Sequence, residues 1–226
     1  MTSLAKRTPE KINLVQEDSQ VDLAYAQIEE LIATLQLPPG HMVSENMLSS
    51  LIGLGRTPVR EALQQLSREG LVVIMPKRGI VVSEIDVKKQ LRLLEVRREI
   101  ERYLVGAAAK RAEDAEREAF SQLAQSMRIA SQDSDGEAFL ELDRKFNKLV
   151  IKAGRNEYAS SVMKLMQGLS RRFWFAHYKR FANLPETALL HAIIAQHIAE
   201  GKSEEAMSDL DTLLDNVEAF TRATID

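Results

Sequence analysis

The sequence predicts a mainly α protein, with an N-terminal winged helix-turn-helix followed by a C-terminal all-α helical bundle. Three observations lead to this fold class. Short amphipathic helical patterns occupy the first part of the chain, two β-branched runs follow them, and from Asp86 onward only long amphipathic helical patterns occur. Three small helices and a hairpin are typical of a winged helix-turn-helix, whereas several long helices without strands form a bundle.

The composition sets limits on the class of protein. The chain has 226 residues, of which 45% are hydrophobic, a formal net charge of −3 and no cysteine. A chain of this size can bury one sizeable core or two smaller ones, and without cysteine it has no disulfides and no thiolate metal sites. Because no stretch has the length and apolarity of a signal peptide or a transmembrane helix, we expect a cytoplasmic protein without a membrane partner.

The N-terminal part of the chain divides into an arm and a small domain. The polar residues 1–20 show no helical periodicity and are expected to form a flexible arm. Residues 21–84 are expected to form the winged helix-turn-helix domain. Its first helix is predicted from Leu23 to Leu35 by apolar spacing and is expected to end at Pro38-Pro39-Gly40, because proline cannot continue the helical hydrogen bonds.

Two further helices are predicted before the strands. Ser44 is a suitable N-cap for a short helix that Gly53 ends. Thr57 followed by Pro58 indicates the cap and the first residue of a third helix, and Gly70 ends it. The inner side of this third helix is an apolar stripe made of Val59, Ala62, Leu63 and Leu66.

The remaining elements follow from a change of periodicity. The β-branched runs 71–75 and 80–82 flank the segment Pro76-Lys77-Arg78-Gly79 and predict a β-hairpin with a basic tip. Residues 85–226 are expected to form an all-helical domain for effector binding and dimerisation. Its predicted helices cover roughly residues 87–111, 113–132, 135–153, 157–182, 186–200 and 203–222.

The third helix presents polar groups that suit DNA. Arg56 and Thr57 stand at its N-terminus, and Arg60 and Gln64 follow at intervals of one turn. Backbone N–H groups at a helix start bind phosphates, and the guanidinium fork of arginine matches a guanine edge in the major groove.

The hairpin tip supports the same interpretation. Lys77 and Arg78 suit the neighbouring minor groove or the DNA backbone. Between Leu51 and Val82 five Lys or Arg residues oppose two acids, which gives this part of an acidic chain a charge of +3. For any one of these residues a solvated surface is the alternative explanation, but the order of cap, arginine spacing and basic hairpin favours DNA binding.

Residues 25–84 closely resemble the DNA-binding domain of GntR-family transcription regulators, through YAQIEELI, LPPG, SENMLSSLIGLGRTPVREALQQLSREGLV and RGIVV. The helical remainder resembles the effector domain of the FadR-type (FCD) branch of that family. The resemblance implies a homodimer that binds a palindromic operator and responds to a small metabolite. It also implies DNA contacts by Arg56, Thr57, Arg60 and Gly79. Gly55 and Asn46 stand where family members often carry Ser or Thr and a DNA-reading arginine, which leaves the operator sequence open.

Many FCD domains resemble one another in a divalent-metal site made by one aspartate and three histidines. Here Asp143 and His191 match two of these ligands, whereas Asn147 and Leu213 stand at the other two positions. An open metal site takes about three protein ligands, so we expect no cofactor and an incomplete metal site, with a retained divalent metal as the alternative. The resemblance implies instead that Asp143, Asn147 and His191 line an effector pocket, in which Arg97 pairs with a small carboxylate. The alternatives are a core histidine satisfied by a carboxylate and a surface arginine.

The segment RRFWFAHYKRF, residues 171–181, gathers aromatic side chains around the single tryptophan, Trp174. At helical spacing such a cluster is expected in the core or in a dimer contact, and closure of the effector pocket is the alternative.

Together these patterns predict a ligand-responsive DNA-binding transcription regulator rather than an enzyme, namely a repressor released by a small organic acid. A metal-dependent helical hydrolase using Asp143, His191 and His197 is the alternative from another class, although it lacks a third convincing ligand and the HExxH spacing. A second alternative is a DNA-binding dimer whose helical domain senses no ligand.

Overall fold

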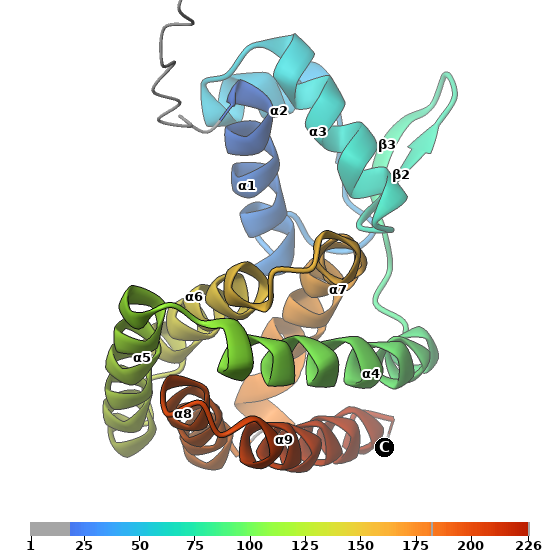
Figure 1. Cartoon of the computed structure of the whole chain (residues 1–226). Helices are drawn as coiled ribbons and strands as arrows, with labels where there is room; N and C mark the ends of the chain where they lie inside the picture. Colours follow the sequence, from blue (N-terminus) through green and yellow to red (C-terminus); the bar gives the residue numbers. More distant parts are fainter. Residues whose placement is uncertain (1–18, 182, 226) are drawn as a thin grey trace, which may run out of the picture.

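The structure, a computed structural model, describes residues 19–181 and 183–225 and consists of a small N-terminal domain stacked on a helical domain (Figure 1). The N-terminal domain contains α1 (Gln20–Ala33), β1 (Met42–Val43), α2 (Glu45–Ile52), α3 (Arg56–Arg68), β2 (Val72–Met75) and β3 (Gly79–Val82). The strands form an antiparallel sheet in the order β1-β3-β2. The predicted winged helix-turn-helix is therefore confirmed, and the short strand β1 is an addition that the sequence pattern did not predict.

Helix α1 differs from its prediction at both ends. Ser19 caps it through a capping box with Asp22, so the helix begins at Gln20, inside the predicted arm; residues 1–18 lie outside the described residues. The helix ends at Ala33, well before the prolines, because the Thr34 hydroxyl bonds back to the carbonyl of Glu30 and Leu35 has a φ of +59°. The turn brings Leu37 back into the domain core, where it is buried.

Six helices form the second domain of the described chain: α4 (Val87–Arg111), α5 (Asp114–Asp133), α6 (Gly136–Gly154), α7 (Glu157–Phe181), α8 (Leu184–Ala199) and α9 (Ser203–Ala223). Their ends lie within two residues of the predicted ones. Buried side chains from all six helices form one core, in which Leu104, Phe120 and Ile194 are fully enclosed. In the part of the chain that the structure describes, no helix is long and apolar enough to cross a membrane.

The two domains meet along α7, which lies under α1 in Figure 1. The guanidinium of Arg171 donates to Glu29 at 2.5 Å and also to Glu30, both on α1. Its neighbour Arg172 is buried and donates to the carbonyl oxygens of Ser83 at 2.8 Å and of Glu84 at 3.3 Å, in the segment that joins the domains. Consecutive arginines of α7 therefore hold both the first helix and the connecting segment of the N-terminal domain.

The same stretch of α7 is packed closely against the N-terminal domain. A Cβ atom added at Gly168 would lie only 2.6 Å from a methyl carbon of Leu71. Leu169 packs against the core of the N-terminal domain. The seam between the domains thus combines apolar contact with buried charge.

Candidate nucleic-acid interface and polar cluster

Helix α3 separates an apolar side from an exposed polar side. Val59, Ala62, Leu63 and Leu66 are at most 1% exposed and pack into the domain core. The predicted DNA-binding residues of this helix are all exposed: Arg56, Thr57, Arg60 and Gln64. The buried stripe therefore fixes the helix so that these four side chains face the solvent.

The start of α3 corrects one prediction. The N-cap is Gly55, which provides no side-chain hydrogen bond, and Thr57 is the second helical residue rather than the cap. Pro58 is tolerated because the first backbone N–H groups of a helix have no intrahelical partner. The N–H groups at this end consequently remain without a side-chain cap, as a phosphate-binding helix start requires.

Two arginines of α3, Arg56 and Arg60, are held by a residue that the sequence patterns did not single out. Glu45, at the start of α2, accepts hydrogen bonds from Nε and Nη2 of Arg60 at 2.8 and 2.9 Å, and its carboxylate lies 3.7 Å from Arg56. The hydrogen bond from Arg60 lowers the pKa of Glu45. Glu45 therefore orients both arginines in the free protein. The sequence does place an acid directly after the N-cap Ser44, but an acid at this position is normally explained by its interaction with the helix dipole.

The hairpin between β2 and β3 lies beside α3 and forms the wing (Figure 1). Arg78 N donates to Met75 O at 3.0 Å, which closes a turn in which Lys77 has a φ of +62°. Gly79 follows with a φ of +105°, where a Cβ atom would lie 3.2 Å from Met42 Cε. Lys77, Arg78 and Gly79 are all exposed at this tip, so the wing offers two cations and an open backbone.

Three of the predicted effector residues meet inside the helical domain. Asp143 Oδ1 lies 3.1 Å from His191 Nε2 and accepts a hydrogen bond from Asn147 Nδ2 at 3.0 Å. His191 Nδ1 lies 2.8 Å from the carbonyl oxygen of Thr187, which can only accept, so this nitrogen carries a hydrogen. The other ring nitrogen, Nε2, faces Asp143 and can donate a hydrogen bond to its carboxylate if it carries a hydrogen as well. Burial alone would raise the pKa of Asp143, but the bond from His191 and the nearby charges lower it below its ordinary value.

Arg97 lies beside this cluster but has its own partner. Its Nε and Nη2 donate to the two carboxylate oxygens of Glu101 at 2.6 and 3.2 Å, and the two side chains are 15% and 4% exposed. Its charge helps to lower the pKa of Asp143. Arg97 is thus an inward-facing arginine, not a surface one, and an acidic ligand would share it with Glu101.

This cluster offers fewer donors than the divalent-metal site that the sequence resemblance implied. Asp143 and His191 supply two ligands, and the amide nitrogen of Asn147 is directed at Asp143. Leu213 is buried in the core and offers no donor atom. His197 is bound to Asp209 at 2.7 Å, away from this set, and the described residues contain no group of three or more His, Cys, Asp or Glu that could hold a metal. Of the three residues of the hydrolase alternative, Asp143 and His191 meet, but His197 does not join them.

Helix α7 adds buried polar groups to the inner side of the domain. Gln167 Nε2, Ser170 Oγ and Trp174 Nε1 are buried and have no hydrogen-bond partner in the described part of the chain. Their spacing of three and four residues places them on one face of α7, together with the core residues Met163 and Met166. Buried donors without a partner are costly, and a bound ligand is one way to satisfy them.

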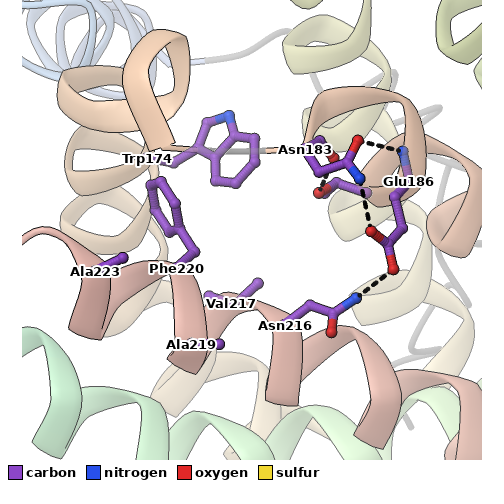
Figure 2. A pocket seen from close by; sticks show the side chains of 9 residues that line it. Trp174, Asn183, Glu186, Asn216, Val217, Ala219, Phe220 and Ala223 are labelled. Atoms are coloured by element: carbon purple, nitrogen blue, oxygen red, sulfur yellow. Dashed lines mark hydrogen bonds between the residues drawn. The ribbon is translucent and has the colours of Figure 1, made fainter.

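The aromatic segment of α7 is part of the core and also borders a cavity. Phe173 is 2% exposed, whereas Trp174 packs between Phe139 and Phe220, with ring centroids 6.3 and 5.0 Å away. The cavity has a volume of about 280 Å³ and lies between α7, α8 and α9, with Trp174 and Phe220 on one side (Figure 2). This segment therefore contributes to the core, as predicted, and its Trp174 also borders a cavity.

The comparisons with known proteins agree with this architecture. Residues 20–82 match the family model described as bacterial regulatory proteins, gntR family, and residues 92–216 match the FCD domain. The chain is 26% identical over 171 residues to the Nta operon transcriptional regulator of Aminobacter aminovorans, which covers 74% of this chain and 78% of that protein. It is 47% identical over 62 residues to a regulator from an unstable DNA locus of Streptomyces ambofaciens.

Some of these relatives are matched over only part of their length. The match covers 26% of the Streptomyces protein and 54% of a regulator from Agrobacterium vitis that is 36% identical over 97 residues. Among solved structures, Escherichia coli McbR/YncC has a TM-score of 0.80 at 16% identity, with 93% of this chain and 100% of that chain covered. A regulator from Rhodococcus has a TM-score of 0.68 at 20% identity, with 90% and 98% covered. At these identities the structural likeness concerns the fold.

Proposed function

Because the chain belongs to the GntR family of bacterial regulatory proteins and carries an FCD domain, we propose that it is a DNA-binding transcription regulator controlled by a small ligand. The matching families consist of regulators, which leaves the hydrolase alternative without support. A protein that acts on the bacterial chromosome works in the cytoplasm, where we place it.

The exposed polar side of α3 is the observation that carries this proposal. Arg56, Thr57, Arg60 and Gln64 lie there above a buried stripe, and the basic wing lies beside them. We assign base reading in the major groove to Arg56 and Arg60, with Gln64 next along the helix. Phosphate contact belongs to Thr57 and the uncapped helix start, and Lys77, Arg78 and Gly79 of the wing contact the adjacent backbone or minor groove.

A homodimer on a palindromic operator follows from the size of this surface, because one short recognition helix contacts too few base pairs for specificity.

An exposed apolar face of the helical domain suits the dimer contact. Val96 and Tyr103, seven residues apart on α4, are 51% and 43% exposed, and Tyr158 and Leu165 on α7 are 78% and 48% exposed. Asn156 at the start of α7 donates to the Tyr103 hydroxyl at 2.8 Å, so these two helix faces adjoin.

The ligand proposed for the helical domain is a small organic acid. His191, Asn147 and Arg97 bring donor groups to the cluster around Asp143, and α7 adds the unpartnered donors of Gln167, Ser170 and Trp174. Donors that lack an acceptor suit a ligand rich in oxygen acceptors, and they favour a sensing domain over one that only dimerises. We further propose that the acid releases the operator, so that the protein is a repressor.

The test begins with selection of binding sites from random DNA by the full-length protein. The expected product is a two-fold symmetric sequence that binds one dimer, with the molar mass measured by light scattering. Organic acids are then added to the complex in a gel-shift titration. A single asymmetric half-site bound by a monomer would contradict the operator proposal, and insensitivity to all acids that bind the protein would contradict the repressor proposal.

A further inference from the structure

The cavity between α7, α8 and α9 is separate from the Asp143 cluster and has different chemistry. Its walls combine the rings of Trp174 and Phe220, small apolar side chains of α9, and a polar edge at the start of α8 (Figure 2). A volume of about 280 Å³ suits a ligand of a few heavy atoms. Glu186 is the single charged residue among those that line it in the described chain.

Glu186 is held in place by neutral groups. Its Oε2 accepts a hydrogen bond from Asn183 Nδ2 at 2.8 Å, and its Oε1 accepts one from Asn216 Nδ2 at 3.2 Å. Among the side chains that the structure describes, which do not include those of residues 179–182, no Lys, Arg or His lies at ion-pair distance from this carboxylate. The two amides orient the carboxylate at the edge of the cavity without neutralising its charge, as Figure 2 shows.

This arrangement favours a cation over an anion. The amide nitrogens, which would serve an anion, are directed at Glu186, whereas the carboxylate keeps lone pairs for another donor. Phe220 and the neighbouring Ala219 and Ala223 lie in the last turn of α9, whose carbonyl end carries partial negative charge. Aromatic rings such as those of Trp174 and Phe220 attract organic cations more than they attract hydrated metal ions.

We propose that this cavity binds a small organic ammonium ion, with its charged group at Glu186 and its alkyl part against Trp174 and Phe220. The site is separate from the DNA-binding surface, but it shares Trp174 with the donors of α7 that we propose for the acid. Thr187, which also lines the cavity, accepts the Nδ1 hydrogen of His191 through its carbonyl oxygen. The cavity therefore lies directly beside the Asp143 cluster, and Thr187 contacts both.

The single tryptophan allows a direct test. The indole N–H of Trp174 gives one cross-peak in a ¹⁵N–¹H spectrum of the full chain, and we expect it to shift saturably on titration with n-butylammonium chloride. 1-Butanol, of similar size but without charge, should shift it at least ten-fold less readily. No DNA is present, so failure of the operator proposal would not affect the result.

Three variants locate the ligand. Glu186→Gln keeps the shape of the side chain and should weaken n-butylammonium binding at least ten-fold, whereas Glu218→Gln, on α9 but outside the cavity lining, should change it less than two-fold. Ala223→Phe fills the exposed rim with little risk to folding and should abolish binding. Circular dichroism verifies that each variant is folded. Preferential binding of 1-butanol, or undiminished n-butylammonium binding by Glu186→Gln or Ala223→Phe, would overturn the proposal.

Discussion

Replacement of Arg171 by methionine tests the seam between the two domains. The Arg171 and Glu29 side chains are 17% and 13% exposed, with Nη1 and Oε2 2.5 Å apart. Methionine keeps much of the hydrocarbon length but leaves Glu29 without its counter-charge beside Glu30. Loss of one partner of a buried ion pair costs about 3–5 kcal/mol of unfolding free energy at neutral pH, and we expect this variant to fall in that range.

The pH dependence of this loss has a defined sign. Burial raises the pKa of Glu29 above its ordinary value of 4.5, and Arg171 is the largest opposing influence. Without Arg171 the folded-state pKa rises further, so the protonated carboxyl is favoured by folding. The stabilising contribution of the protonated Glu29 carboxyl is present below pH 4.5 and is lost as the pH rises through the folded-state pKa. The variant should therefore approach the wild type as the pH falls from 7 to about 4.

Urea unfolding at pH 7 and at pH 4 measures both effects, with Trp174 fluorescence and far-UV circular dichroism as two probes of the transition. The double variant Glu29→Gln/Arg171→Met should recover more than half of the loss, because no charge remains buried at position 29. Arg78→Met, at the exposed wing tip, is the matched control and should be neutral. A single variant within about 1 kcal/mol of the wild type, or a double variant no more stable than the single one, would refute the reasoning.

Three further predictions concern the proposed sites. Arg60→Ala should cost about 1–3 kcal/mol for the selected operator but little for scrambled DNA, whereas Lys77→Ala should weaken both alike; equal losses for Arg60→Ala on both DNAs in gel shifts would count against base reading. Elemental analysis should find no stoichiometric transition metal in the protein, and Asn147→His/Leu213→His should bind zinc, since it restores four ligands; a metal in the parent protein would contradict this. Asp143→Asn should lose stability at pH 7 but converge with the wild type as the pH falls below 3.8, because the folded-state pKa of Asp143 is lowered and its contribution disappears on protonation; a constant difference across pH in urea unfolding would exclude this role.

The fold could be predicted closely wherever a break in periodicity was visible in the sequence. Gly136, Gly154, Pro185 and Gly201 mark the ends of the long helices, and these ends were predicted within two residues. The end of α1 was wrong because Leu35 continues the apolar spacing although its backbone has left the helix. The strand β1 was missed because two residues cannot display an alternating pattern.

The candidate sites show a similar division between local and distant information. The exposed side of α3 follows from its own apolar stripe, and the proximity of Asp143 and His191 was inferred from family resemblance. The link from Glu45 to Arg60 spans 15 residues and that from Arg171 to Glu29 spans 142. No periodic pattern records such pairings, because they depend on how the elements pack.

The contacts of α7 have a consequence for how proteins of this kind recombine. A crossover between residues 82 and 87 looks like a natural point for exchange, since it separates the sheet from the first long helix. Such a chimera would keep Arg171 but replace the acidic pair of α1 that it binds, whereas the backbone carbonyl that Arg172 binds at position 83 is present in any sequence. Evolutionary or designed exchange of DNA specificity should therefore succeed when the new N-terminal domain supplies the same acidic pair, or when the middle of α7 is transferred with it.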